Sequence, residues 1–335
     1  MMCALVSLIL WLVWPAFVKR IGKLRWELFF YDFILAAFLA ALVAGFTIGT
    51  VGTEITFRDN IAIVGYRQLA FAGLAGVVFG LGSIMFTAAT AVGGASAAGT
   101  MTGAVALIIS TITAYFTVTG VSTGVQFAGV ALAAAAFALV AKALTEVLAL
   151  RRKDATHKTP MRKKADVVGA GVVIAFCIIG GVGFGLFSLF LDWTRDFELP
   201  MTAFPVAALF TFGMLAAGLI FNLYFLNLPV QGDPLSPLTY LRVPLAAHIP
   251  GVLGGIVFTA GLIAFLLMFD APPSAAVPRG IPLAILPAAL GLFAVLGRTV
   301  WNEQDDAIYR TKTIFFAAGF VLVAASLAVV AGYVS

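Results

Sequence analysis

GVVFGLG at residues 76–82 and GIVFTAG at residues 255–261 share the pattern Gly-x-Val-Phe-x-x-Gly, and the second copy follows the first by 179 residues. Trp14 and Trp193 are separated by the same offset. An offset of about half of the 335 residues indicates that the chain consists of two duplicated halves. The alternative is that such a pattern is common in membrane helices, because small residues allow helices to approach closely.

The composition identifies the class of protein. Mean hydropathy is +1.09, 62% of the residues are hydrophobic and only 10% are charged, whereas charged residues make up about 25% of a soluble domain. A helix needs about 20 apolar residues to cross a bilayer, so we predict an all-α polytopic membrane protein with ten spans. The predicted spans are 2–18, 27–50, 67–90, 96–119 and 123–149 in the first half, and 166–191, 202–228, 243–269, 281–300 and 314–334 in the second.

The predicted spans divide into two sets of five. We expect a first repeat at residues 1–150, a basic cytoplasmic loop at 151–165 and a second repeat at 166–335. Because five is odd, the two copies must enter the membrane in opposite senses, which gives an inverted repeat with its solute site between the halves. The loop after the first span is basic, whereas its counterpart at residues 192–198 is acidic, in agreement with this inversion.

The basic residues indicate the orientation. Of 20 Lys and Arg residues, 16 fall on one face of the predicted bundle. Basic residues accumulate on the cytoplasmic side, so both termini are predicted to be extracytoplasmic, in a bacterial inner (plasma) membrane. The first helix lacks a basic segment before it and is followed by Lys19 and Arg20, which favours a retained helix over a cleaved signal peptide. The basic loop is interpreted as a topology determinant and not as a nucleic-acid site.

Short motifs in matching order resemble those of a known group. Ten helices in a 5+5 inverted repeat resemble the drug/metabolite transporter superfamily over nearly the whole chain, and the motifs are similar to those of L-rhamnose/proton symporters and ureide permeases. The motifs that carry the resemblance are Pro15 to Lys19, Trp26-Glu27, Tyr31-Asp32, Asn222-Leu223, Phe225 to Pro229, His248 with Gly254-Gly255, and Trp301-Asn302. The acidic run at residues 303–306 departs from the superfamily, many of whose members have Gly-Glu at the end of the ninth span. The resemblance implies solute transport and leaves the substrate open.

Two titratable residues inside predicted spans are candidates for proton coupling. Ionisable groups at membrane depth are costly and are often functional. Asp32 lies about one and a half turns into its helix, and His248 belongs to the residue type that most often serves as a proton-linked switch. The alternatives are that Asp32 pairs with Lys19, Lys23 or Arg25, and that His248 makes a helix-end hydrogen bond.

Hydroxyl, amide and indole groups are candidates for substrate binding. The third and fourth spans are rich in Ser and Thr and carry no charge, which suits a neutral solute that forms hydrogen bonds. The candidate substrate-binding residues are Trp14, Ser83, Thr87, Thr100 and Asn222. Two alternatives stay open: Asn222 can join two helices, and Trp14 can belong to an interfacial aromatic belt.

Glycine and proline positions predict packing faces and hinges. Gly76, Gly82, Gly255 and Gly261 should form symmetry-related helix-packing faces around a central cavity. Prolines interrupt helices and leave backbone carbonyls free, which is tolerated where the backbone faces protein or a cavity. The expected interruptions are at Pro15, Pro205, Pro250 and Pro287.

The leading functional hypothesis is a secondary active transporter that imports a small neutral polar solute, of sugar or ureide type, by alternating access. The expected coupling ion is a proton, with sodium as the alternative. The alternative is an exporter of amphipathic metabolites or drugs on the same fold. An intramembrane enzyme would need a catalytic cluster that the sequence lacks. Cys3 and Cys177 lie in apolar helices, so no metal, cofactor or disulfide is expected. The expected partners are the solute, the lipid bilayer and, in a homodimer, a second copy.

Overall fold

The computed structural model describes residues 1–22, 24–51, 55–117, 122–158, 168–270, 278, 280–301 and 309–333. Regular structure in this part of the chain is helical, without a strand. Ten of the described helices are long and apolar enough to cross a membrane, so the chain is an integral membrane protein. They are α1 (Met2–Val13) continued by the 3₁₀ helix η1 (Trp14–Arg20), α2 (Trp26–Phe46), α4 (Tyr66–Gly93), α5 (Ala95–Thr117), α6 (Thr123–Lys158), α7 (Ala170–Trp193), α8 (Ala203–Asn227), α9 (Leu245–Leu267), α10 (Gly280–Thr299) and α11 (Tyr309–Ala331).

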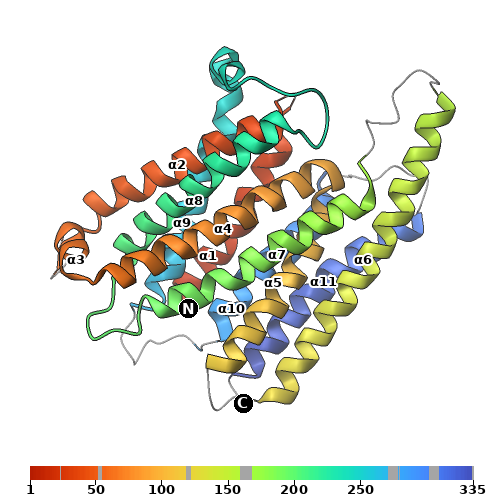
Figure 1. The fold of residues 1–335 in the computed structure, drawn as a ribbon. Helices are drawn as coiled ribbons and strands as arrows, with labels where there is room; N and C mark the ends of the chain where they lie inside the picture. The colour runs from red at the N-terminus through yellow and green to blue at the C-terminus, as the bar shows by residue number, and fades with distance from the viewer. Residues whose placement is uncertain are drawn as a thin grey trace.

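The helices form one bundle with both chain ends at the same end of it (Figure 1). In the interior, α4 packs against α7 and α8, while α9 packs against α1 and α2. Helix α5 contacts α7 and α10, and α10 also contacts α1 and α11. Helices α6 and α11 pack on each other and form one edge of the bundle (Figure 1).

Glycines set the closest helix contacts. A Cβ atom on Gly76 of α4 would overlap the Phe210 carbonyl of α8, and one on Gly82 would lie 2.9 Å from the Gly180 carbonyl oxygen of α7. In the second copy of the motif, a Cβ on Gly255 would overlap the Phe33 carbonyl of α2. The motif glycines therefore lie at interior contacts, where a larger side chain would separate the helices.

Local chemistry explains several helix ends. The first span changes from α to 3₁₀ at Trp14, where Pro15 provides no amide hydrogen for the α-helical pattern. Gly94 joins α4 to α5 with φ of 94°, a conformation that suits glycine. Pro250 and Pro287 lie inside helices. The prediction for Pro205 was wrong, because it lies in the first turn of α8, where the missing amide breaks no helical bond.

Two short helices were not predicted. These are α3 (Phe57–Ile63) and the 3₁₀ helix η3 (Pro237–Arg242), and both lie in connections between spans. Helix α6 also continues to Lys158, beyond the predicted end of its span at residue 149, because hydropathy detects the membrane boundary and not the end of the helix. Lys23, residues 159–165 of the basic loop and the acidic run at 303–306 lie outside the described residues.

Candidate functional site

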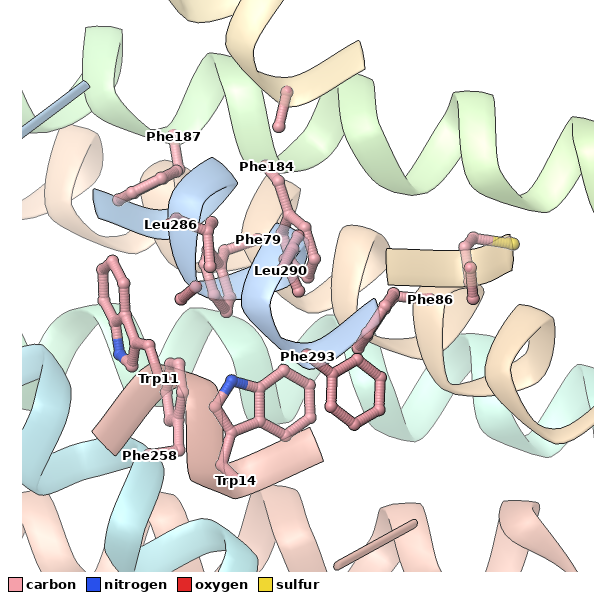
Figure 2. Close-up of a cluster of buried hydrophobic side chains, with 14 of the residues drawn as sticks. Trp11, Trp14, Phe79, Phe86, Phe184, Phe187, Phe258, Leu286, Leu290 and Phe293 are labelled. Carbon is pink, nitrogen blue, oxygen red and sulfur yellow. The ribbon is translucent and has the colours of Figure 1, made fainter. Parts of the chain in front are cut away.

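A cluster of aromatic side chains fills the middle of the bundle (Figure 2). Phe79 of α4 and Phe258 of α9 meet there, with ring centroids 5.2 Å apart. Trp11 and Trp14 lie against the same two helices, and all four side chains are fully buried. The residues of the cluster that Figure 2 labels are Trp11, Trp14, Phe79, Phe86, Phe184, Phe187, Phe258, Leu286, Leu290 and Phe293. It draws residues from both halves of the chain.

Unpartnered polar atoms lie within this apolar cluster. The Trp11 and Trp14 indole nitrogens and the Ser83 hydroxyl are buried and have no hydrogen-bond partner in the described structure. Ser83 lies four residues after Phe79 and three before Phe86, so helical periodicity places it on the face of α4 that meets the cluster. A buried polar group without a partner costs about 1–3 kcal/mol, which makes these three groups the best candidates for contact with a solute.

The other candidate substrate residues are placed differently. The Thr87 hydroxyl donates to the Ser83 carbonyl oxygen of its own helix, at 2.8 Å. Thr100 is buried and its hydroxyl has no partner, but Ala104 and Leu107 of the same helix face pack with α6 and α11. Helical periodicity therefore places Thr100 on the α6 side of α5, away from Ser83. Asn222 joins two helices, because its Nδ2 donates to the Glu27 carbonyl oxygen at 2.7 Å.

A cavity of about 550 Å³ opens at the end of the bundle that holds the chain termini. We call it the vestibule. Phe265 of α9 lines it and also stacks on Trp11, with ring centroids 5.0 Å apart. The vestibule thus ends against the central cluster. Its lining residues are Ala114, Ser188, Leu191, Asp192, Trp193, Arg195, Asp196, Phe265, Phe269, Pro282, Leu283 and Tyr333.

Arg195 is the cation of the vestibule lining. Its guanidinium lies 4.2 Å from the centre of the Phe269 ring, and Nη1 lies 3.8 Å from Asp270 Oδ1. Burial lowers the pKa of Arg195, while Asp270 and Asp192 oppose that change. Burial likewise raises the pKa of Asp270, whereas the hydrogen bond from the Ala203 amide and the charge of Arg195 act to lower it. The Asp270 carboxylate accepts from that amide at 2.9 Å, which ties the vestibule wall to the start of α8.

A second polar cluster lies at the opposite end of α9. His248 Nδ1 lies 3.0 Å from Asp32 Oδ1 and 2.9 Å from Oδ2, and the Tyr240 hydroxyl donates to Asp32 Oδ1. Asp32 is only 3% exposed. His248 and Phe265 are 17 residues apart in α9, which separates this cluster from the vestibule by about 25 Å along the helix.

Of the nearby basic residues, the two that the structure describes, Lys19 and Arg25, do not pair with Asp32. Arg25 instead pairs with Glu27 at 2.5 Å, and its Nη1 donates to the Asp233 carbonyl oxygen. Lys19 reaches the Thr90 carbonyl oxygen at 3.5 Å. The predicted proton-coupling residues, Asp32 and His248, are therefore brought together, whereas Tyr240 was missed because it lies in a connection between spans.

No group of three or more His, Cys, Asp or Glu side chains in the described chain could hold a metal ion. No known family model matches the sequence, and no curated protein matches it. A solved protein crystal structure is similar to this one over 97% of this chain and 94% of that chain, with 14% sequence identity and a TM-score of 0.55. At that identity, the likeness establishes a shared fold alone.

Proposed function

We propose that this membrane protein is a secondary active transporter that imports a small neutral polar solute, of sugar or ureide type, together with a proton. The observation that carries the proposal is the set of unpartnered polar atoms on Trp11, Trp14 and Ser83, buried in mid-bundle behind an open vestibule. A solute that supplied their hydrogen bonds would remove an energetic cost of about 1–3 kcal/mol for each group. A purely structural core would gain nothing from these groups.

The proposed fold is a 5+5 inverted repeat of the drug/metabolite transporter type. The contacts between helices agree with such a repeat. If each span is replaced by its equivalent in the other half, the contact of α4 with α8 becomes that of α9 with α2, and the contact of α4 with α7 becomes that of α9 with α1. All four contacts are present. The glycines obey the same exchange, because Gly76 meets α8 whereas Gly255 meets α2. Phe79 and Phe258, equivalent under the 179-residue offset, touch each other in the middle. A two-fold axis between these two rings would account for all three observations.

The chemistry of the cluster favours a neutral solute with hydrogen-bond acceptors. An indole nitrogen only donates, so Trp11 and Trp14 require acceptor atoms such as hydroxyl or carbonyl oxygens. The labelled cluster contains no charged side chain, and an ionised solute there would lose its hydration without an opposite charge. The flat aromatic faces suit a ring, as in a sugar or a ureide.

The two ends of the bundle differ as alternating access requires. The vestibule opens one end, while Asp32, Tyr240 and His248 join α2, η3 and α9 at the other. The basic-loop distribution predicts that the vestibule faces outward, which fits import. In this proposal, Asp32 and His248 carry the coupled proton at the closed end.

Uptake by purified protein in liposomes tests the proposal. Sugars, purine-breakdown products and amino acids would first be screened for thermal stabilisation of the protein, and each stabilising solute would then be used as the labelled probe. We expect an inward proton gradient to drive accumulation, and its collapse with a protonophore to leave only equilibration. Solute entry that ignores the gradient would contradict proton coupling, and a complete absence of solute entry would contradict import.

An apolar groove of about 410 Å³ favours the alternative of an exporter for amphipathic molecules. It lies between α1, α2 and α9 and is lined by residues including Val6, Ala44 and Ala260. Such a groove would admit an amphipathic solute from the lipid. If export is the function, Ala260→Trp should block efflux of a fluorescent amphipathic dye from liposomes. If polar import is the function, the substitution should leave uptake within about twofold of the unsubstituted protein, because Ala260 lines the groove and not the vestibule.

A further inference from the structure

Tyr240 is the residue through which η3 reaches the interior of the bundle. Leu238 and Leu241 of η3 are 62% and 77% exposed, whereas the Tyr240 ring lies edge to face with that of Tyr31 on α2, with centroids 6.0 Å apart. The residue before the cap of η3, Leu235, donates its amide to the Leu226 carbonyl oxygen of α8. Ser236 caps the first turn of η3, and Arg25 reaches the preceding loop at the Asp233 carbonyl oxygen. The hydroxyl of half-buried Tyr240 alone links η3 to the buried carboxyl group of Asp32.

Tyr240 and His248 share one carboxyl group. Their rings lie edge to face with centroids 4.7 Å apart, and both approach Asp32 Oδ1. On α9, a Cβ at Gly251 would overlap Asp32, so glycine permits this close approach. Burial and the negative charge of Asp32 raise the pKa of Tyr240 well above its usual range. Tyr240 therefore stays a hydrogen-bond donor at every physiological pH.

The other charged groups near this cluster are engaged or exposed. On α2, Glu27 is fully buried and paired with Arg25. On η3, Arg242 is exposed. Helix α8 presents Asn222, which bonds to the Glu27 backbone and not to Asp32. Among the described groups, His248 and Tyr240 are therefore the two that respond directly to the charge of Asp32.

We propose that Tyr240 is a latch that holds the closed end of the bundle shut, and that a proton bound by Asp32 releases it. An ionised carboxylate accepts from both Tyr240 and His248, and hydrogen bonds to a charged acceptor are roughly twice as strong as neutral ones. Protonation removes the charge and turns one carboxyl oxygen into a donor. The hydrogen bond that joins η3 to Asp32 is then weakened, because the carboxyl group no longer carries a charge. Pro250, which interrupts the hydrogen bonds of the first turns of α9, lets this segment move.

This inference rests on the proposed transport function for its purpose, but its test does not need a solute. Hydrogen exchange of the full-length protein in lipid nanodiscs would be followed by mass spectrometry for peptides covering residues 235–250. Rates would be corrected for the intrinsic effect of pH. We expect the wild-type segment to exchange about tenfold faster near pH 5.5 than near pH 8, because opening of the latch exposes its amides.

Three variants separate the latch from a structural role. In Asp32→Asn, residues 235–250 should exchange fast at both pH values. In Tyr240→Phe they should do the same, although the aromatic ring against His248 is kept. Tyr224→Phe removes the same hydroxyl from an exposed residue of α8, and it should behave as wild type. Wild-type exchange that does not change with pH would overturn the proposal, as would slow exchange in Tyr240→Phe. If the latch responds but liposomes take up no solute, the proposed transport function fails and the latch stands.

Discussion

Gly76→Ala is expected to destabilise the protein by about 3 kcal/mol, the upper end of the usual cost of overpacking a core. The added methyl group would overlap the Phe210 carbonyl, which is backbone and cannot rotate away. Gly73→Ala is the matched control in the same helix, because nothing lies within 4 Å of a Cβ at that position. There the change should be neutral or stabilising by up to about 1 kcal/mol, from improved helix propensity. Reversible unfolding in detergent micelles would measure both values.

The second copy of the motif offers an independent pair. Gly255→Ala should cost as much as Gly76→Ala, because its methyl group would overlap the Phe33 carbonyl of α2. At the neighbouring Gly254, the nearest atoms to a Cβ lie at 3.6 Å, an ordinary contact, so Gly254→Ala should be tolerated. Equal costs at Gly254 and Gly255 would mean that α9 does not pack on α2 as described. A matched pair of large effects at Gly76 and Gly255 would strengthen the case for the inverted repeat.

The membrane spans could be predicted from sequence, whereas the rotation of each helix could not. Long apolar runs separated by polar residues locate the spans directly, and the structure contains ten such helices in its described part. Helix α5, in contrast, has small apolar residues on every side. Its sequence therefore does not indicate whether Thr100 faces the centre of the bundle. Its contacts with α6 and α11 decide that face.

The same limit applies to the two polar clusters. Asp32 and His248 were identifiable because ionisable residues are rare at membrane depth, and their predicted depths placed both near the same membrane face. Their contact depends on α2 packing against α9, which places side chains 216 residues apart together. The ion pair of Arg195 with Asp270 could not be predicted, since it depends on how the ends of α7 and α9 converge. Tyr240 lies in a connection between spans, where hydropathy gives no indication of a contact with Asp32.

Ser83→Ala is expected to have opposite effects on stability and on solute binding. The substitution removes a buried hydroxyl that has no partner, so the solute-free protein should gain about 1 kcal/mol of folding stability. The hydrogen bond from the Thr87 hydroxyl to the Ser83 carbonyl oxygen is unaffected by the change. If a solute bonds to the Ser83 hydroxyl, its affinity should fall by about tenfold or more. Detergent unfolding and the solute concentration dependence of liposome uptake would measure the two effects.

Ser326→Ala controls for the helix propensity that any Ser→Ala change improves. Ser326 is equally buried, but its hydroxyl donates to the Leu322 carbonyl oxygen of α11 at 2.9 Å. Ser326→Ala should leave solute affinity unchanged. It should stabilise the protein less than Ser83→Ala does, because it removes an existing hydrogen bond to the Leu322 carbonyl oxygen. A hydroxyl with a structural role at position 83 would lower stability when removed, and a hydroxyl with no role would leave affinity unchanged. Only the removal of a hydroxyl that bonds to the solute would both stabilise the solute-free protein and weaken solute binding. The two measurements together therefore test whether the central cluster is the solute site.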